Sequence, residues 1–276
     1  MEPFERIVKD IKSLKIQGAE NVAKAAIDAW SISKDKAKAS AILRRTRPTE
    51  PMLRNVLHYL NNGGDPISIK KQINDGTDKI AAYGSGMIPN NGIVYTHCHS
   101  STVEAILEHA KNIGKKFEVN ATETRPDYQG RITARNLASH GIKVTLFVDS
   151  AALSAIKNAD LMLIGSDAIT VYGGIVNKIG SRMFAKLASE LEVPVYVASH
   201  SLKFDPITRW GRLEKIEERS TSEVWPDKPK GVKVVNNVFD FVPSEYIASM
   251  ITELGVLPYS ELLDKIVAAY PWLRRT

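Results

Sequence analysis

The spacing of hydrophobic residues changes partway along the chain. From residue 3 to about 83, hydrophobic residues recur at intervals of three and four positions, as at Phe4, Ile7 and Ile11. This spacing predicts several amphipathic helices. It is interrupted at Gly18 and at the NNGGDP run over 61–66, because glycine and proline end regular structure. We therefore expect a helical domain over residues 1–84.

Beyond residue 84, short runs of β-branched residues alternate with longer helical patterns, which is typical of βαβ units and a parallel sheet. The predicted strands are Ile93–His97, Phe117–Ala121, Val144–Val148, Leu161–Ile164, Val195–Ala198 and Val232–Val235. The predicted helices span residues 102–113, 130–139, 151–158 and 178–191. The fold class is therefore α/β: an N-terminal helical domain followed, over residues 85–276, by a Rossmann-like doubly wound domain with a mostly parallel sheet of about six strands. Such sheets bind ligands beyond the carboxyl ends of their strands.

The composition is that of an ordinary globular protein, with 276 residues, of which 43% are hydrophobic and 25% are charged. Cys98 is the single cysteine, so no internal disulfide can form and a reducing compartment is expected. No hydrophobic run approaches the roughly 18 residues that a membrane span needs, and the first residues lack the apolar core of a signal peptide. We expect a soluble, cytoplasmic protein that does not associate with membranes.

The net charge of +6 comes from 37 Lys and Arg residues against 31 Asp and Glu residues. The basic residues are scattered along the helical pattern and are not clustered with aromatic residues, which favours solvated helix faces over a nucleic-acid surface. No nucleic-acid partner is therefore expected.

The segment IVYTHCHSSTVEAILEHAK places Cys98 between a predicted strand and a predicted helix. Ser101 followed by Glu104 matches a capping box, so Ser101 is the expected N-cap and the helix begins near Thr102. Cys98 then lies near the positive end of the helix dipole and between two histidines, an environment that lowers the pKa of a thiol. This pattern favours a reactive cysteine.

Two other interpretations of Cys98 stay open from position alone. The residue can be a small buried hydrophobe beside two polar neighbours. It can also bind zinc together with His97 and His99, but the alternation of a strand turns Cys98 away from both histidines, which makes a zinc site within this tripeptide geometrically poor. No metal site is therefore predicted.

A carboxylate is expected at the carboxyl end of another strand. The apolar strand Leu161–Ile164 runs into Gly165, so Asp167 projects beyond the strand, where partial shelter raises the pKa of a carboxyl group and suits it to act as a general acid. Alternatively, Asp167 caps backbone groups in a turn. Asn177 and Lys178, at the start of the helix predicted over 178–191, can reach an anion.

Further polar residues follow other predicted strands. Arg125 and Gln129 lie in a turn fixed by Pro126 and suit phosphate or hydroxyl groups, and Arg125 is the better candidate for a ligand contact. Either can instead bridge subunits. Lys203 is a cation at the same edge of the sheet, although an exposed lysine without a ligand is the common case.

Taken together, these segments resemble the family of the archaeal ribose-1,5-bisphosphate isomerases, the methylthioribose-1-phosphate isomerases and the alpha, beta and delta subunits of eukaryotic initiation factor 2B. The likeness spans nearly the whole chain with collinear spacing. The matching stretches are TRPT at 46–49, THCHS at 96–100, TETRP…QG at 122–130, VDSA at 148–151, GSDAIT…GGIVNKIG at 165–180, LKFDP at 202–206 and FDFVPSEYI…ITELGVLP at 239–258.

The resemblance implies roles for individual residues. In the isomerases of the family a cysteine and an aspartate form the catalytic pair, which implies Cys98 as the proton acceptor and Asp167 as the proton donor. The matching substrate contacts are Arg47, Ser100, Ser101, Thr102, Asn177, Lys178 and Lys203. The IQGAEN stretch, with Gln17, Gly18, Ala19 and Glu20, stands where the isomerases usually carry an Arg-Gly-Ala-Gly-like phosphate turn, and Glu20 is expected to repel a phosphate there.

The implied function is that of a sugar-phosphate aldose–ketose isomerase that converts ribose 1,5-bisphosphate to ribulose 1,5-bisphosphate by acid–base chemistry at Cys98 and Asp167 without a cofactor. The alternatives are a methylthioribose-1-phosphate isomerase, or an initiation factor 2B-like regulatory subunit that binds a nucleotide or sugar phosphate and contacts translation factors. The family also implies a homo-oligomer, a dimer or a hexamer. The segment VFDFVPSEYIASMITEL at 238–254 carries an apolar stripe that fits either the core or such an interface.

Overall fold

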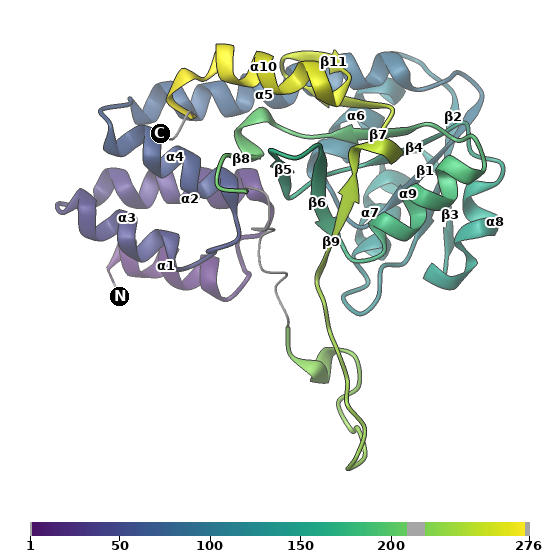
Figure 1. Ribbon diagram of the computed structural model, residues 1–276, viewed down its shortest axis with the longest axis horizontal. Coiled ribbons are helices and arrows are strands. Elements are labelled where there is room, and N and C mark those ends of the chain that lie inside the picture. The colour runs from purple at the N-terminus through teal and green to yellow at the C-terminus, as the bar shows by residue number, and fades with distance from the viewer. Residues whose placement is uncertain (1, 209–218, 274–276) are drawn as a thin grey trace.

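The computed structural model describes residues 2–208 and 219–273. Helices come first in the chain and lie to one side of an α/β body (Figure 1). Those before the first strand are α1 (Pro3–Lys12), α2 (Ala19–Ile32), α3 (Lys36–Arg44), α4 (Pro51–Asn61) and α5 (Pro66–Met87). A proline opens α1, α4 and α5, where its missing N–H and fixed φ suit the first helical turn. Helix α5 continues through the expected boundary at 84, which stays a prediction.

The main sheet has seven strands in the order β11-β10-β7-β4-β1-β2-β3, and every neighbouring pair is parallel except β10 and β11. These strands are β1 (Gly92–His97), β2 (Phe117–Thr122), β3 (Lys143–Phe147), β4 (Leu161–Ile164), β7 (Val195–Ala198), β10 (Ser249–Thr252) and β11 (Gly255–Leu257). The helices around and beyond them are α6 (Ser101–Asn112), α7 (Gln129–Ser139), α8 (Ala152–Ile156), α9 (Ser181–Glu190) and α10 (Tyr259–Ala269). The predicted doubly wound α/β class is confirmed.

The strand order reverses direction between β1 and β4, because β2 and β3 extend to one side of β1 while β4, β7 and β10 extend to the other. In a doubly wound sheet, this reversal opens a crevice at the carboxyl ends of the two central strands. Cys98 follows β1 directly, and Asp167 follows β4. The topology therefore brings the two predicted catalytic loops to one place.

A smaller sheet has the strand order β8-β5-β6-β9. In the sequence, its strands lie between strands of the main sheet. Its strands are β5 (Ala168–Thr170), β6 (Gly174–Lys178), β8 (Phe204–Asp205) and β9 (Phe239–Pro243). The predicted helix start at 178 is wrong, because Asn177 and Lys178 end β6 and α9 begins only after Gly180, whose φ is 96°.

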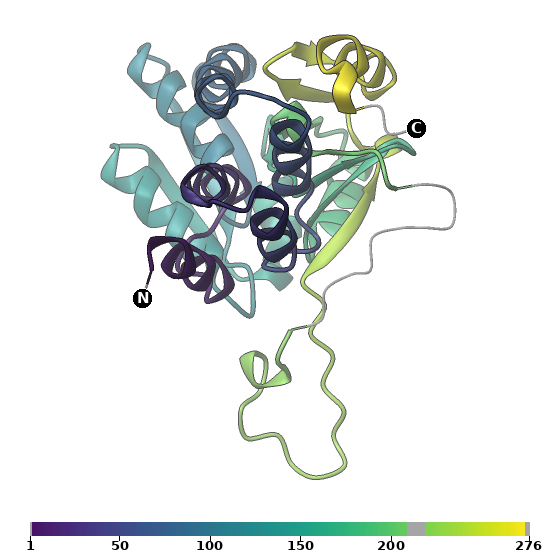
Figure 2. The same cartoon turned by 90° about the vertical axis from the view of Figure 1, so that its left-hand side faces the viewer.

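The predicted strand Val232–Val235 is also wrong. It lies in a segment that extends away from the body between residue 219 and β9 (Figure 2). Val232 and Val235 are 38% and 58% exposed, and no strand among residues 2–208 and 219–273 pairs with this β-branched run. The sixth parallel strand is β10, where Met250 and Ile251 are fully buried on opposite faces of the sheet.

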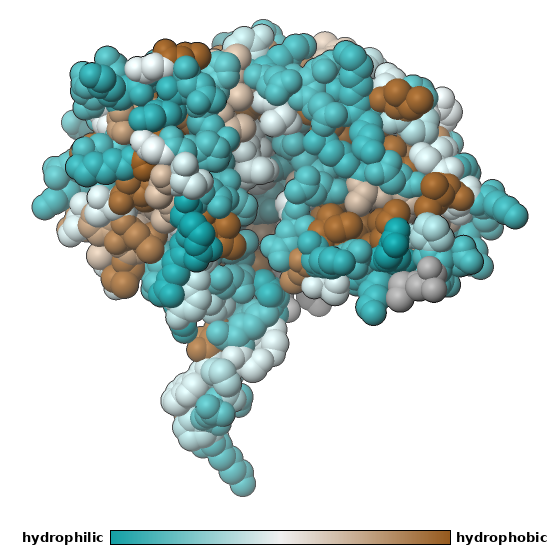
Figure 3. Space-filling model, turned by 180° about the vertical axis from the view of Figure 1, so that it is seen from behind, coloured by the Kyte–Doolittle hydropathy of each residue, from teal (hydrophilic) through white to brown (hydrophobic). Residues whose placement is uncertain are grey.

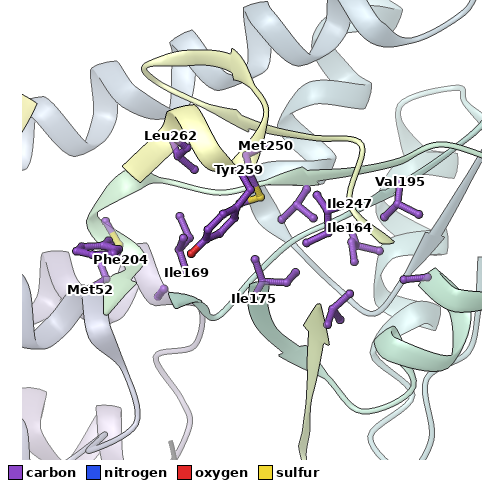
Figure 4. Packing of buried hydrophobic residues seen from close by; sticks show 14 of the residues in the cluster. Met52, Ile164, Ile169, Ile175, Val195, Phe204, Ile247, Met250, Tyr259 and Leu262 are labelled. Carbon is purple, nitrogen blue, oxygen red and sulfur yellow. The ribbon is translucent and has the colours of Figure 1, made fainter. Parts of the chain in front are cut away.

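The largest core cluster joins the two sheets to the helices. Met52 of α4, Ile164 of β4, Ile169 of β5 and Leu262 of α10 belong to it (Figure 4), and the hydroxyl of Tyr259 donates a hydrogen bond to the carbonyl of Thr170. The apolar side chains of the 238–254 segment include Val242, Met250 and Ile251, none of which is exposed. Of the two interpretations of that segment, the core applies to these residues.

The surface seen from behind is mainly hydrophilic, with separate apolar spots (Figure 3). Within residues 2–208 and 219–273, no helix combines the length and the hydropathy that crossing a membrane requires.

Candidate functional site

A cavity of about 460 Å³ lies at the carboxyl ends of β1 and β4. Its walls come from the starts of α2 and α4, the loops after β1 and β4, strand β6 and the base of the extended segment. The polar and charged residues that line it, among those described, are Gln17, Glu20, Asn21, Arg47, Glu50, Cys98, His99, Ser100, Ser101, Asp127, Gln129, Ser166, Asp167, Asn177, Lys178, Lys203 and Arg219. It therefore combines many charged groups in a small volume.

The loops that carry Cys98 and Asp167 lie in contact. A side chain in place of Gly165 would put its Cβ 2.5 Å from the Ser100 Oγ atom, which is far inside van der Waals distance. It would also lie 2.9 Å from the Ser100 Cβ atom, so any larger residue would force the Ser100 side chain or its loop to move. The sequence therefore fixes the approach of the two strand ends through one glycine.

Cys98 occupies a turn that the strand pattern did not predict. Its φ is 72°, in the left-handed region that non-glycine residues rarely adopt. The Thr124 hydroxyl accepts a hydrogen bond from the Cys98 N–H at 3.0 Å, and the Cys98 carbonyl accepts one from Thr133 at 3.0 Å. These bonds direct the thiol toward Gln129, whose Oε1 atom lies 3.3 Å from Sγ.

The expectation of a lowered thiol pKa is wrong for this structure. Burial raises the pKa of Cys98 to about 12, and this effect outweighs nearby Lys178, which lowers the pKa. Cys98 is only 9% exposed. The free energy lost when the thiolate is removed from water therefore exceeds the free energy gained from one nearby cation and the start of a helix. Cys98 is therefore a thiol at neutral pH.

The neighbouring histidines have structural partners. Burial lowers the pKa of His97 to about 4, and its ring lies 2.8 Å from the Thr122 hydroxyl and 2.9 Å from the Ile179 carbonyl. The His99 Nδ1 atom lies 3.0 Å from a carboxylate oxygen of Glu104. The two rings thus bond different partners, because the left-handed turn at Cys98 replaces the strand alternation that would have placed both histidines on one face.

The predicted N-cap of the following helix is wrong by one residue. Ser100 is the N-cap, and its Oγ accepts a hydrogen bond from the Val103 N–H at 3.4 Å. Glu104 does not complete a capping box, because its carboxylate bonds His99 and the Asn136 amide. Ser101 thereby begins α6 and lines the cavity.

Asp167 is half-buried at the end of β4, and its N–H donates to the Val176 carbonyl at 2.8 Å. Lys203 is buried beside it, and its Nζ donates to the Ser166 carbonyl at 2.7 Å. The interpretation of Lys203 as an exposed surface lysine is wrong. Asp167 and Lys203 therefore form an acid and a cation on one wall of the cavity.

Strand β6 brings a second cation to the cavity. Lys178 is buried, and its Nζ lies 3.2 Å from an Asp127 carboxylate oxygen, which also accepts a hydrogen bond from Arg219 at 2.8 Å. The Asn177 amide donates to Ser181 at 2.9 Å. Asp127 and Arg219 were missed in the sequence, because only the fold brings the base of the extended segment to the loop after β2.

All four residues of the Gln17–Glu20 stretch line the cavity at the start of α2. Glu20 is buried, and its carboxylate accepts hydrogen bonds from Thr77 at 2.8 Å and from Thr102 at 3.4 Å. Thr102 itself does not line the cavity, and it contacts the cavity residue Glu20 through this hydrogen bond.

The structure separates Arg125 from the other predicted residues. Its side chain is exposed, its guanidinium contacts the Tyr128 hydroxyl, and it donates to the Val224 carbonyl at 3.3 Å. Gln129 lines the cavity and Arg125 does not. Glu50, by contrast, lines the cavity although its sequence position gave no signal beyond its place next to the TRPT stretch.

Fold and site define an α/β protein whose polar pocket, at the switch point of a parallel sheet, pairs a thiol and a carboxyl group with several cations. The model of the Initiation factor 2 subunit family matches residues 15–259. Ribose 1,5-bisphosphate isomerase of Pyrococcus furiosus is 35% identical, over 98% of this chain and 95% of that protein. The chain belongs to the Initiation factor 2 subunit family.

Two solved structures extend the comparison. Translation initiation factor eIF-2B of Pyrococcus horikoshii OT3 has a TM-score of 0.82 and 28% identity, covering 94% of this chain and 98% of that one. The 5-methylthioribose 1-phosphate isomerase of the same organism has a TM-score of 0.79 and 25% identity, covering 96% and 88%.

Proposed function

We propose that the protein is an aldose–ketose isomerase that converts ribose 1,5-bisphosphate to ribulose 1,5-bisphosphate. The observation that carries the proposal is that Cys98 and Asp167 line one cavity with the cations Arg47, Lys178 and Lys203. It is supported by the 35% identity, over nearly the whole chain, to a protein named for this activity.

The chemistry follows from the substrate. A sugar phosphorylated at C1 does not open its ring spontaneously, so Asp167 donates a proton to the ring oxygen as the ring opens. Cys98, in the small thiolate fraction that its raised pKa leaves near neutral pH, takes the proton from C2 and returns it to C1 of the enediol-type intermediate, while the Asp167 carboxylate takes back a proton from the C2 hydroxyl as the ketone forms. The cations hold the phosphate groups and stabilise the charge that develops.

The other cavity residues have positioning roles under this proposal. Gln129 accepts the hydrogen bond of the Cys98 thiol and so orients it. The remaining groups, which contact sugar hydroxyls or phosphate oxygens, are Gln17, Gly18, Ala19, Ser100, Ser101 and Asn177. No metal or organic cofactor takes part in these steps.

Turnover by the purified protein tests the proposal. Ribose 1,5-bisphosphate is supplied beside ribose 5-phosphate and methylthioribose 1-phosphate, and the ketose products are measured. We expect conversion of the bisphosphate. Preferred conversion of methylthioribose 1-phosphate would replace the substrate, and the absence of turnover with all three would contradict an isomerase.

A regulatory subunit is the second candidate, because the eIF-2B structure matches this chain with a TM-score of 0.82. Under it, the cavity binds a sugar phosphate or nucleotide and the protein contacts translation factors. Tight binding without turnover would favour this candidate.

We further propose a cytoplasmic homo-oligomer, a dimer or a hexamer. Strand β3 lies at the edge of the main sheet, and three apolar residues of this part of the chain are exposed: Leu146 in β3 at 42%, Val148 just after β3 at 53% and Leu153 in α8 at 54%. Exposed apolar groups on an edge strand favour pairing with another chain. Light scattering that gives a mass near 30.5 kDa at micromolar concentration would contradict the oligomer.

A further inference from the structure

Glu50 is a buried carboxyl group for which the proposed steps have no use. It is the N-cap residue of α4, a position whose side chain commonly accepts a hydrogen bond from the first helical turn, yet it makes no such cap. The side chain is 5% exposed and lines the cavity. Its Oε1 atom is buried without a hydrogen-bond partner among residues 2–208 and 219–273.

The charged groups that face Glu50 come from four elements. They are Arg47 in the preceding turn, Arg54 in α4, Asp167 after β4 and Lys203 after β7. Arg54 donates to buried Asp205 at 2.8 Å, and Lys203 donates to a backbone carbonyl. These cations are therefore partly engaged elsewhere.

Arg47 adds a second unpartnered group at the same wall. Its Nε atom is buried and, within the described part of the chain, has no hydrogen-bond partner. Buried polar atoms are nearly always hydrogen-bonded in folded proteins. Two orphaned atoms, one on Arg47 and one on Glu50, thus stand beside one cavity and indicate a polar ligand group that bonds both.

We propose that Glu50, in its protonated form, binds a phosphate group of the ligand by donating a hydrogen bond to a phosphate oxygen, so that ligand binding takes up one proton from solvent. The proposal rests on the proposed function for the identity of the ligand. The shared chemistry is that of a tetrahedral dianion beside the Arg47 guanidinium.

The charge balance of the cavity supports this role. Among the described residues that line it, four are acidic, namely Glu20, Glu50, Asp127 and Asp167, and four are basic. With all of them ionised, a phosphate dianion meets no net attraction. Neutral Glu50 removes one repelling charge and supplies a donor, which an ionised carboxylate lacks.

The electrostatics agree in direction. Burial, reinforced by Asp167, raises the pKa of Glu50 to about 7 against the opposing effect of Lys203, Arg47 and Arg54. A bound dianion raises this pKa further, because a nearby negative charge disfavours the carboxylate. Near neutral pH, Glu50 is therefore poised to take up a proton as the ligand enters.

The test is the pH dependence of sulfate binding by the full chain, since sulfate stays a dianion across the range used. Calorimetric titration at pH 6, 7, 8 and 9 is carried out on the wild type and on Glu50→Gln, which keeps the shape and carries no charge. We expect the wild-type affinity to fall about tenfold per pH unit above pH 7, as one linked proton requires. The affinity of Glu50→Gln should change less than threefold over the same range.

A matched control is Glu190→Gln, which removes one negative charge at an exposed position and should reproduce the wild-type dependence. An equal fall in Glu50→Gln and wild type would overturn the proposal, because the linked proton would then belong to another group. Failure of wild type to bind sulfate at pH 6 would overturn it as well.

A second measurement does not depend on the variant folding. Titration of the wild type at pH 8 in buffers with different ionisation enthalpies gives the number of protons taken up, expected to be close to one. A value near zero contradicts the proposal. Sulfate binding requires no turnover, so a protein that isomerises none of the sugars can still show the proton linkage, and the two proposals fail separately.

Discussion

The starts of α2 and α4 bring two glutamates to the same cavity, and the two are almost equally buried, with Glu20 8% and Glu50 5% exposed. Glu20 accepts hydrogen bonds from Thr77 and Thr102, and the Lys24 Nζ lies 3.8 Å away. Glu50 instead has an orphaned oxygen and faces Asp167. Equal burial thus has different consequences, because partners decide whether a buried carboxylate is satisfied within the protein or left to meet a ligand.

The largest expected effect tests whether the cavity that contains both glutamates is an acid–base catalytic site. Cys98→Ser should lower kcat on the order of a hundredfold or more, the scale of general acid–base catalysis, while sulfate affinity stays near the wild-type value. Asp167→Asn should behave likewise, because an amide cannot donate the proton. Steady-state kinetics with ribose 1,5-bisphosphate measure both, and near-normal turnover by Cys98→Ser would remove the cysteine mechanism.

The second effect concerns the hydrogen bonds that hold α4, the helix that begins after Glu50, to the segment around Lys203. The Asn55 amide is buried and donates to the carbonyls of Leu202 and Phe204 at 2.8 and 2.7 Å, on both sides of Lys203. Asn55→Ala leaves both carbonyls without this donor and should lower the free energy of unfolding by about 2–4 kcal/mol.

Urea unfolding measures this loss, and Asn62→Ala serves as its control. Asn62 is exposed at the end of the same helix, so its substitution should change stability by roughly 0.5 kcal/mol or less. Equal stabilities of Asn55→Ala and wild type would mean that α4 is fixed to the Lys203 segment by other contacts.

The third effect addresses Glu20 directly. Gln17→Arg combined with Glu20→Gly adds a cation and removes an anion at the start of α2, and each change is worth on the order of 1 kcal/mol at partly screened distances. The affinity for ribose 1,5-bisphosphate should therefore rise by up to roughly a hundredfold. Titration at several salt concentrations decides it, since an unchanged affinity would place the ligand away from the Gln17–Glu20 stretch.

The smallest effect is a change of kcat with each pH unit, and it depends on the Cys98 thiol rather than on the two glutamates. Because burial raises the pKa of Cys98 to about 12, the thiolate fraction grows about tenfold per pH unit throughout the neutral range. If the thiolate is the base, kcat at saturating substrate should climb with pH between 6 and 9. A flat profile of kcat would show that a step other than proton abstraction by Cys98 limits turnover.

Sequence patterns predicted secondary structure correctly where neighbouring residues alone decide the structure. Strands β4 and β7 were predicted residue for residue, because continuous apolar runs bounded by polar turns leave little choice of structure. The run at 232–235 had the same local character and is not a strand, since no strand in the described part of the chain pairs with it. The N-cap at Ser100 differed from the prediction by one residue, because two adjacent serines offer the same capping oxygen.

The sequence by itself determined the α/β class, the placement of Cys98 and Asp167 after two strands, and the family, because apolar periodicity and motif spacing are written along the chain. Tertiary structure alone decided that the Cys98 pKa rises, that Arg125 lies outside the cavity, and that Glu50 lies within it. Those outcomes depend on desolvation and on partners that are distant in sequence. A buried charge is governed by what surrounds it in space, and no local pattern records that.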